Sequence, residues 1–121
     1  MSGNEKNAQL YTIGYFLEIA GGDMDFIKKM LQLFINMMPG LVSEMIAAYE
    51  SVDLQEMGRI AHKIKPNLDN MSIPLVTQTI REIEAMGKAG NHSPQLPAML
   101  TEIKTVIENV ISQIGKDYPD L

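Results

Sequence analysis

The sequence predicts an all-α protein, an antiparallel up-and-down four-helix bundle with a short additional helix at its N-terminal end. Apolar residues recur at helical spacings almost throughout the chain, and the alternation that is typical of strands is nearly absent. Apolar residues make up 45% of the 121 residues, which is enough to build the core of one ordinary domain. The connections between the predicted helices are short, so consecutive helices are expected to be antiparallel neighbours.

In the N-terminal half of the chain, the sequence predicts a leader, a short helix and a long helix. Residues 1–9 are polar and are expected to form a flexible leader before a domain that spans residues 10–121. A short apolar pattern then stops at a pair of glycines, after which Asp23 is a candidate N-cap. The following stripe continues past Pro39, which predicts one long helix with a kink at that proline, or alternatively two helices with a break there. The stripe comprises Phe26, Met30, Leu33, Phe34, Met37, Leu41, Val42, Met45, Ile46 and Tyr49.

Three more helices are predicted in the C-terminal half. Asp53 is the candidate N-cap of the first of them. Its apolar face comprises Met57, Ile60, Ala61, Ile64, Leu68 and Met71. Ser72 is expected to cap the next helix, which Gly87 and Gly90 are expected to end. Gly115 is expected to close the last helix.

The composition excludes several classes of function. With 15 acidic and 10 basic side chains the formal net charge is −5, which argues against nucleic acid or an anionic membrane as the partner. The absence of cysteine excludes disulfides and thiolate metal sites. The leader lacks the apolar run of a signal peptide, and no stretch approaches the roughly 20 apolar residues that span a bilayer. We therefore expect a cytoplasmic protein.

His62 is the residue at which the sequence predicts chemistry. It points about 160° away from Ile64, the centre of the apolar face of its helix, and is therefore expected to be exposed. Lys65 shares its helix face, and Arg59 is a possible second cation on the other side. A phosphoryl acceptor needs such a site, because a ring nitrogen attacks while cations offset the charge of the transferred group. His92 lies in a polar loop and is expected to be solvated.

Two further residues flank the imidazole. Gly58, one turn before His62, leaves no side chain standing over the ring. Pro66, one turn after it, cannot donate a hydrogen bond to the carbonyl of His62. A local bend of the helix is therefore expected beside the histidine.

Three segments, in order, resemble the histidine-containing phosphotransfer (HPt) domain family. The segment Arg59-Ile-Ala-His-Lys-Ile-Lys-Pro-Asn67 resembles the family's Ala-His-x-Leu-Lys signature. Residues 21–26 look like its Gly-Asp-x-x-Phe entry into the second helix, and Glu82-Ile-Glu84 is similar to its Leu-Glu signature. The resemblance runs from about Tyr11 to the end of the last predicted helix. In two departures, Pro66 and Ser72 stand where many members have glycine.

The resemblance implies that His62 is phosphorylated and that Lys65 is its supporting cation. The domain would be a phosphorelay intermediate in two-component signalling, shuttling phosphoryl groups between the aspartates of response-regulator receivers, with a hybrid histidine kinase as one candidate source of a receiver. It would by default be a monomer. It would have no independent catalytic activity and no cofactor or metal of its own, since magnesium belongs to the receiver. Docking is expected to use exposed apolar residues such as Phe16 or Met24.

Two other classes of function compete with this one. The same bundle without phosphorylation would be a scaffold or an inhibitory module that binds a receiver or a kinase; the presence of both His62 and Lys65 favours transfer. A di-iron enzyme would need glutamate three residues before each histidine, where this chain has Arg59 and Ala89. Glu82 and Glu84 are expected to be ordinary solvated residues on an exposed helix face.

Overall fold

The computed structural model describes residues 9–121, which form five helices and no strand. The helices are α2 (Gly14–Ala20), α3 (Met24–Glu50), α4 (Leu54–Asn70), α5 (Pro74–Ala89) and α6 (Leu96–Asp117). The predicted all-α class is confirmed for this part of the chain. The predicted leader, residues 1–9, lies outside the described residues except for its last position.

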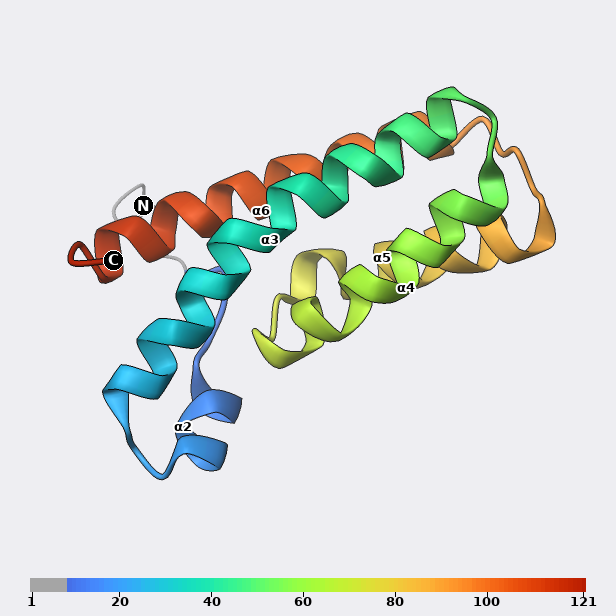
Figure 1. Cartoon of the computed structure of the whole chain (residues 1–121). Helices are drawn as coiled ribbons and strands as arrows, with labels where there is room; N and C mark the ends of the chain where they lie inside the picture. Colours follow the sequence, from blue (N-terminus) through green and yellow to red (C-terminus); the bar gives the residue numbers. More distant parts are fainter. Residues whose placement is uncertain (1–8) are drawn as a thin grey trace, which may run out of the picture.

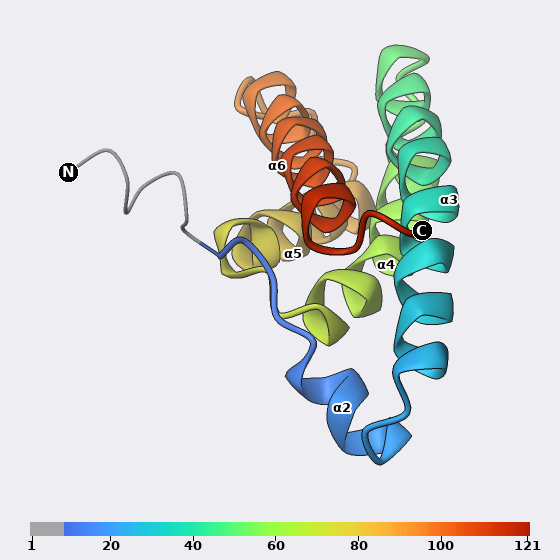
Figure 2. The same cartoon turned by 90° about the vertical axis from the view of Figure 1, so that its left-hand side faces the viewer.

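The four long helices pack into one body. Figure 1 shows α3 and α6 side by side, with α4 and α5 below them, and each long helix runs back along the one before it. Contacts are densest between α4 and α5, and α3 also contacts both α4 and α6. The short α2 packs against α3, and Figure 2 shows it below the first turns of that helix. The pair α4 and α5 is therefore the most closely packed part of the molecule.

Buried apolar side chains form a single core to which every helix contributes. All six residues of the predicted apolar face that ends at Met71 are buried, as expected. The buried residues of α3 are Ile27, Leu31, Phe34, Met38, Val42, Met45 and Ala48. The predicted stripe of α3 is therefore wrong in its first half, where Leu33 and Met37 are 50% and 43% exposed. Apolar residues surround the helix there, so their spacing alone does not select the buried face.

The long helix α3 continues through Pro39 without a break, as expected. Among residues 9–121 it is the one helix that is long and apolar enough, by length and composition, to cross a membrane. This finding corrects the expectation that no stretch comes close to that length. It is weak evidence for a membrane span, because a core helix of a soluble bundle passes the same test. Here α3 packs against α2, α4 and α6.

Several predicted helix ends are displaced. Ile73, not Ser72, precedes the first residue of α5, and Ser72 adopts a left-handed φ of 50° in the connection from α4. Gly87 lies inside α5, and Gly90, with φ 65°, ends it. The last helix continues past Gly115 and ends at Asp117. Glycine occurs both at helix ends and where two backbones approach closely, and the sequence does not distinguish the two.

The segment before α2 holds together two elements that lie at one end of the bundle. The Thr12 N–H donates to the Met71 carbonyl at 2.9 Å, and the Tyr11 hydroxyl donates to Asp117 Oδ2 at 2.7 Å. Tyr11 is 1% exposed, and its burial together with the bond to Asp117 raises the pKa of its hydroxyl well above the usual value. The connection from α4 to α5 is thus fastened to the last turn of α6.

Replacing Val52 with glycine is expected to raise the free energy of unfolding by about 1 kcal/mol. Val52 has φ 59° in the turn between α3 and α4, a conformation that costs an L-residue roughly 1–2 kcal/mol. Its side chain is 62% exposed, so little packing is lost, although glycine also adds unfolded-state entropy. Urea unfolding measures the gain, and Val52→Ala, which keeps the Cβ, should gain less. Equal stability of the native chain and the glycine variant would contradict the expected strain.

Candidate functional site

The site is built where α4 and α5 touch through two glycines. A Cβ added to Gly87 would lie 2.5 Å from Gly58 Cα and 2.7 Å from both Gly58 N and Leu54 O. A Cβ on Gly58 would likewise lie 3.1 Å from Gly87 Cα. The two backbones are therefore in direct contact, which leaves no room for a side chain at Gly87. Gly58 was expected to keep the space over His62 open, and its larger role is to let the helices approach.

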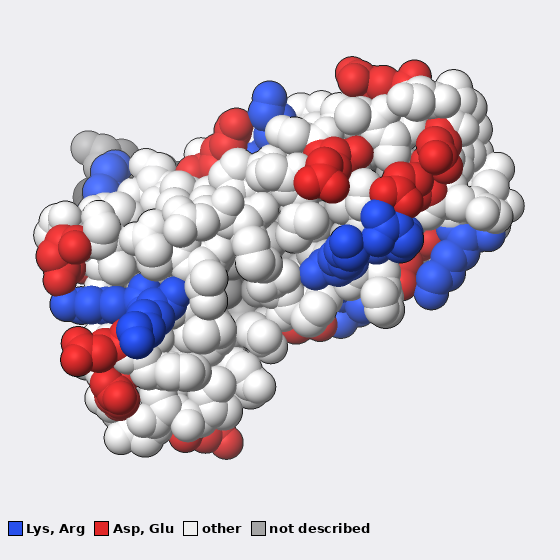
Figure 3. Space-filling view, viewed as in Figure 1, with Lys and Arg blue, Asp and Glu red and all other residues white. Residues whose placement is uncertain are grey.

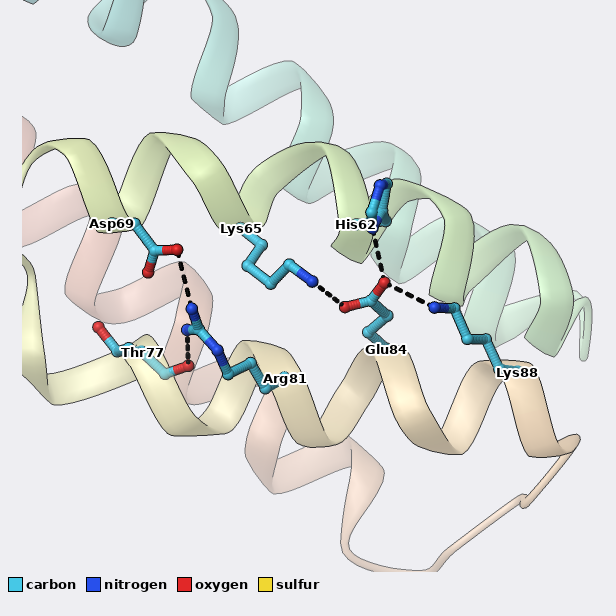
Figure 4. Close-up of polar contacts among 7 residues, drawn as sticks. All are labelled: His62, Lys65, Asp69, Thr77, Arg81, Glu84 and Lys88. Carbon is cyan, nitrogen blue, oxygen red and sulfur yellow. Dashed lines mark hydrogen bonds and ion pairs between the residues drawn. The ribbon is translucent and has the colours of Figure 1, made fainter.

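His62 lies one turn after Gly58 on α4, at the edge that faces α5. Its side chain is 63% exposed, which confirms the predicted exposure. Its Nδ1 lies 2.6 Å from Glu84 Oε2 on α5. Figure 4 shows one ring nitrogen directed at this carboxylate and the other directed away from it. One edge of the imidazole is thus held, and the other edge is free.

Glu84 is the residue that sequence reasoning missed. It is only 5% exposed, which corrects the expectation of a solvated side chain. It lies four residues after Ile80 and three before Gly87, both buried, and so falls on the buried stripe of α5. That spacing was a usable signal. Nothing in the sequence indicated that His62 and Lys65, on another helix, are partners of this carboxylate.

Three donors converge on the Glu84 carboxylate. Besides His62, Lys65 Nζ lies 2.8 Å from Oε1, and Lys88 Nζ lies 3.1 Å from Oε2 (Figure 4). The hydrogen bond from Lys65 is the main cause that lowers the pKa of Glu84 to about 2, and the bonds from Lys88 and His62 add to it. Burial acts in the opposite direction and is outweighed. Glu84 is therefore a carboxylate at neutral pH.

An ionised carboxylate fixes the role of each ring nitrogen of His62. A carboxylate only accepts hydrogen bonds, so Nδ1 must carry the proton in this contact. In a neutral imidazole the lone pair is then on Nε2, the nitrogen directed away from Glu84. The arrangement presents an oriented nucleophile at the surface.

The two predicted cations, Lys65 and Arg59, have different partners. Lys65 joins the site through Glu84 and is 27% exposed. Arg59 instead forms two bonds with Glu56, from Nε to Oε1 at 2.7 Å and from NH2 to Oε2 at 2.5 Å. Arg59 nevertheless lines a shallow hollow beside His62, so its supporting role stays a prediction. The hollow is lined by Gln55, Gly58, Arg59, His62 and Lys88.

Other residues singled out in the sequence lie away from this cluster. His92, in the connection between α5 and α6, is exposed and packs its ring edge-on against Tyr49 at a centroid distance of 5.3 Å. Phe16 is only 4% exposed, which corrects its proposed use in docking, whereas Met24 is 41% exposed and remains available. Phe16 is the one buried residue of α2 and anchors that short helix to the core. Within residues 9–121, no three His, Cys, Asp or Glu side chains form a group that would hold a metal ion.

Comparison with known proteins gives one match. The model of the Hpt domain family matches residues 29–113, a range that contains His62, Lys65 and Glu84. No curated protein and no solved structure matched the chain. The family match covers more than half of the chain and includes the whole α4–α5 site. The chain therefore belongs to the Hpt domain family, whose members are carriers in the histidine phosphotransfer of two-component signalling.

Proposed function

We propose that this domain is a phosphorelay intermediate in which Nε2 of His62 accepts a phosphoryl group from one receiver aspartate and donates it to another. The observation that carries the proposal is the exposed His62 ring held at Nδ1 by the buried carboxylate of Glu84. Because the nucleophile is already held in one orientation, phosphoryl transfer requires only that the receiver be aligned with it and that the charge of the transferred group be neutralised. No independent catalytic activity is required of the chain.

The transfer step uses both edges of the ring. The lone pair of Nε2 forms a bond to phosphorus while the bond from phosphorus to the acyl oxygen of the aspartyl phosphate breaks. The electron pair of that bond leaves on the aspartate, which becomes a carboxylate. The His62 ring keeps its Nδ1 proton and gains positive charge, which Glu84 stabilises from 2.6 Å. The reverse step returns the group to a receiver aspartate. The metal ion expected in this reaction is a magnesium ion on the receiver.

Lys65 is proposed to support His62 by neutralising Glu84. The transferred group carries nearly two negative charges, and a bare carboxylate beside it would repel it. The ammonium of Lys65 offsets that charge from 2.8 Å and stays close to the ring. The proposal also includes the antiparallel four-helix arrangement expected from the sequence. In that arrangement α4, which carries His62 and Lys65, packs against α5, which carries Glu84. We also place the domain in the cytoplasm, where receivers are found.

Receiver docking is proposed to involve the exposed apolar residues of α2 and the start of α3. Tyr15, Leu17, Ile19 and Met24 are 41–53% exposed. Figure 3 shows an area without charged side chains between α2 and the middle of α3, with charged groups at its borders. Apolar side chains that remain exposed in such an area are typical of a protein-binding surface.

Replacing Met24 with glutamine is expected to lower the second-order rate constant of transfer from a receiver by about threefold to tenfold, as for a moderate interface residue. Phosphorylation of His62 by phosphoramidate, a small donor that needs no docking, should keep its native rate. Glu18→Gln, an exposed change on α2, serves as the control. An unchanged rate with the receiver would exclude Met24 from the interface.

The proposed function is tested with a phosphorylated receiver that carries radioactive phosphate. The native chain and His92→Gln should acquire label that is labile in acid and stable in alkali, whereas His62→Gln should acquire none. Label on His62→Gln would place the acceptor elsewhere. If a panel of receivers failed to label the native chain but bound to it, the domain would be a scaffold or an inhibitory module.

A further inference from the structure

The three cations near His62 differ in how strongly they are already engaged. Arg59 forms two bonds with Glu56. Lys65 is mostly buried and bonds to Glu84 Oε1 at 2.8 Å. Lys88 is 70% exposed, and its contact with Glu84 Oε2 is longer, at 3.1 Å. It also shares that oxygen with His62 Nδ1. Of these three side chains, Lys88 is the one that can change partners at the smallest cost.

Lys88 also has an open path to the imidazole. It lies on α5 one turn after Glu84, and it lines the same hollow as His62. Gly58 contributes only backbone to that hollow, so no side chain at this position separates the ammonium from the ring. Two successive contacts, 3.1 Å and 2.6 Å long, join Lys88 Nζ to His62 Nδ1 through a single oxygen atom. The phosphoryl group would lie on Nε2, beyond Nδ1, and the flexible four-carbon stem of the exposed Lys88 lets its ammonium move toward that edge of the ring.

We propose that Lys88 binds the phosphoryl group on His62, leaving Glu84 Oε2 when the group arrives. This inference rests on the proposed function of His62. The phosphoryl group carries more negative charge than the carboxylate, and its three oxygens accept strong hydrogen bonds. Glu84 would still keep the bonds from Lys65 and from the Nδ1 proton, so it would not become an unpaired buried charge. Lys65 then neutralises the Glu84 carboxylate, and Lys88 neutralises the phosphoryl group.

The partner exchange makes a prediction about equilibrium rather than rate. Lys88 would stabilise the phosphorylated domain relative to the free domain, so its removal should move the phosphoryl group toward the receiver. Docking contributes nothing to the equilibrium constant between the separated proteins, because that constant compares only their free forms. A measurement at equilibrium therefore isolates the contact between Lys88 and the phosphoryl group from the effects of surface charge on association.

The test brings each chain to equilibrium with one phosphorylated receiver and measures the share of label on the domain and on the receiver. Lys88→Gln should lower the equilibrium constant for the phosphorylated domain by about threefold, as expected for an exposed ion pair. Lys88→Arg, which keeps the charge, should stay within about 1.5-fold of the native value on the same scale. Lys63→Gln, an equal charge change on the exposed surface of α4, is the matched control.

The outcomes separate this inference from the proposed function. A fall in Lys88→Gln alone supports the assignment of Lys88. An equilibrium constant of Lys88→Gln equal to that of the native chain overturns it and leaves the role of His62 intact. An equal fall in Lys63→Gln also overturns it, since the effect would then be one of overall charge. A native chain that takes up no label removes the proposed function together with this inference.

Discussion

Replacing Glu84 with alanine is expected to slow phosphoryl acceptance by His62 by about 10-fold to 100-fold, the range found when a partner that orients a metal-bound histidine is removed. Without the carboxylate, no group on α5 holds the Nδ1 proton, and the ring samples both tautomers and other rotamers. Transfer from phosphoramidate measures the effect without receiver docking. The ¹⁵N shifts of the two ring nitrogens report the tautomer directly.

Two variants sharpen this prediction. Glu84→Gln retains an oxygen that can accept from Nδ1–H and should lose less activity than the alanine variant. Glu82→Ala removes an exposed carboxylate two residues away on α5 and should transfer at the native rate. If Glu84→Ala kept both the native rate and the native ¹⁵N pattern, the carboxylate would have no part in orienting His62.

The same carboxylate should make folding stability depend on pH. Its pKa falls from the usual 4.5 to about 2 in the folded domain, so the unfolded chain binds a proton first as the pH drops. The stabilisation is fully present above about pH 5 and is lost between pH 5 and pH 2, and a shift of this size corresponds to about 3 kcal/mol. Urea unfolding should show Glu84→Gln less stable by this amount at pH 7, with the difference closing toward pH 2. A constant difference across this range would contradict the assignment.

Replacing Gly87 with alanine is expected to destabilise the fold by about 2 kcal/mol, in the range of overpacked cores. The added Cβ would lie 2.5 Å from Gly58 Cα, and the atoms that must yield belong to backbone. Helix α5 would have to move away from α4, which would lengthen the contacts of Glu84 with His62 and Lys65. Phosphoryl acceptance should therefore fall together with stability.

Gly115→Ala is the matched control for this change. Gly115 also lies inside a helix, but a Cβ there would meet nothing within 4 Å. Alanine is favoured over glycine in a helix interior by about 1 kcal/mol and by less in a last turn, where Gly115 lies, so this variant should be more stable than the native chain by less than about 1 kcal/mol. The same substitution is thus expected to have opposite signs at the two positions. A gain in stability at Gly87 would show that α4 and α5 are not in direct contact there.

The sequence predicted most accurately the features that depend on one helix alone, such as which of its residues are buried and which are exposed. The apolar face that begins at Met57 was found buried, and His62, on the opposite side of the same helix, was found exposed. Both follow from the helical period, since the face has one strong stripe among polar residues. In the first half of α3 the same method failed. Leu33 and Met37 were assigned to the core, whereas the residues with 0% exposure there are Ile27, Leu31 and Met38. Apolar residues occur on every side of that helix, so their spacing did not select the buried face.

The candidate site could be predicted only in part, because half of it comes from a second helix. His62 and Lys65 share a face of α4, and their spacing identified them. Glu84 and Lys88 meet them only because Gly58 and Gly87 let the two helices touch. Contacts between helices depend on their relative rotation and distance, which the period of a single helix does not contain. The burial of Glu84 could have been read from its position after Ile80, but its partners could not.

The contact between Gly58 and Gly87 also determines where the chain can change length. The site depends on two short windows, residues 58–65 of α4 and residues 84–88 of α5, each of which must keep its helical register. One inserted residue inside either window would rotate the groups beyond it by about 100° and separate them from their partners. Insertions in the connection between α5 and α6 would leave both windows intact. We therefore expect that natural length variation in such domains falls outside these windows. The spacing of residues within each window should then identify such a site better than the overall similarity of two sequences does.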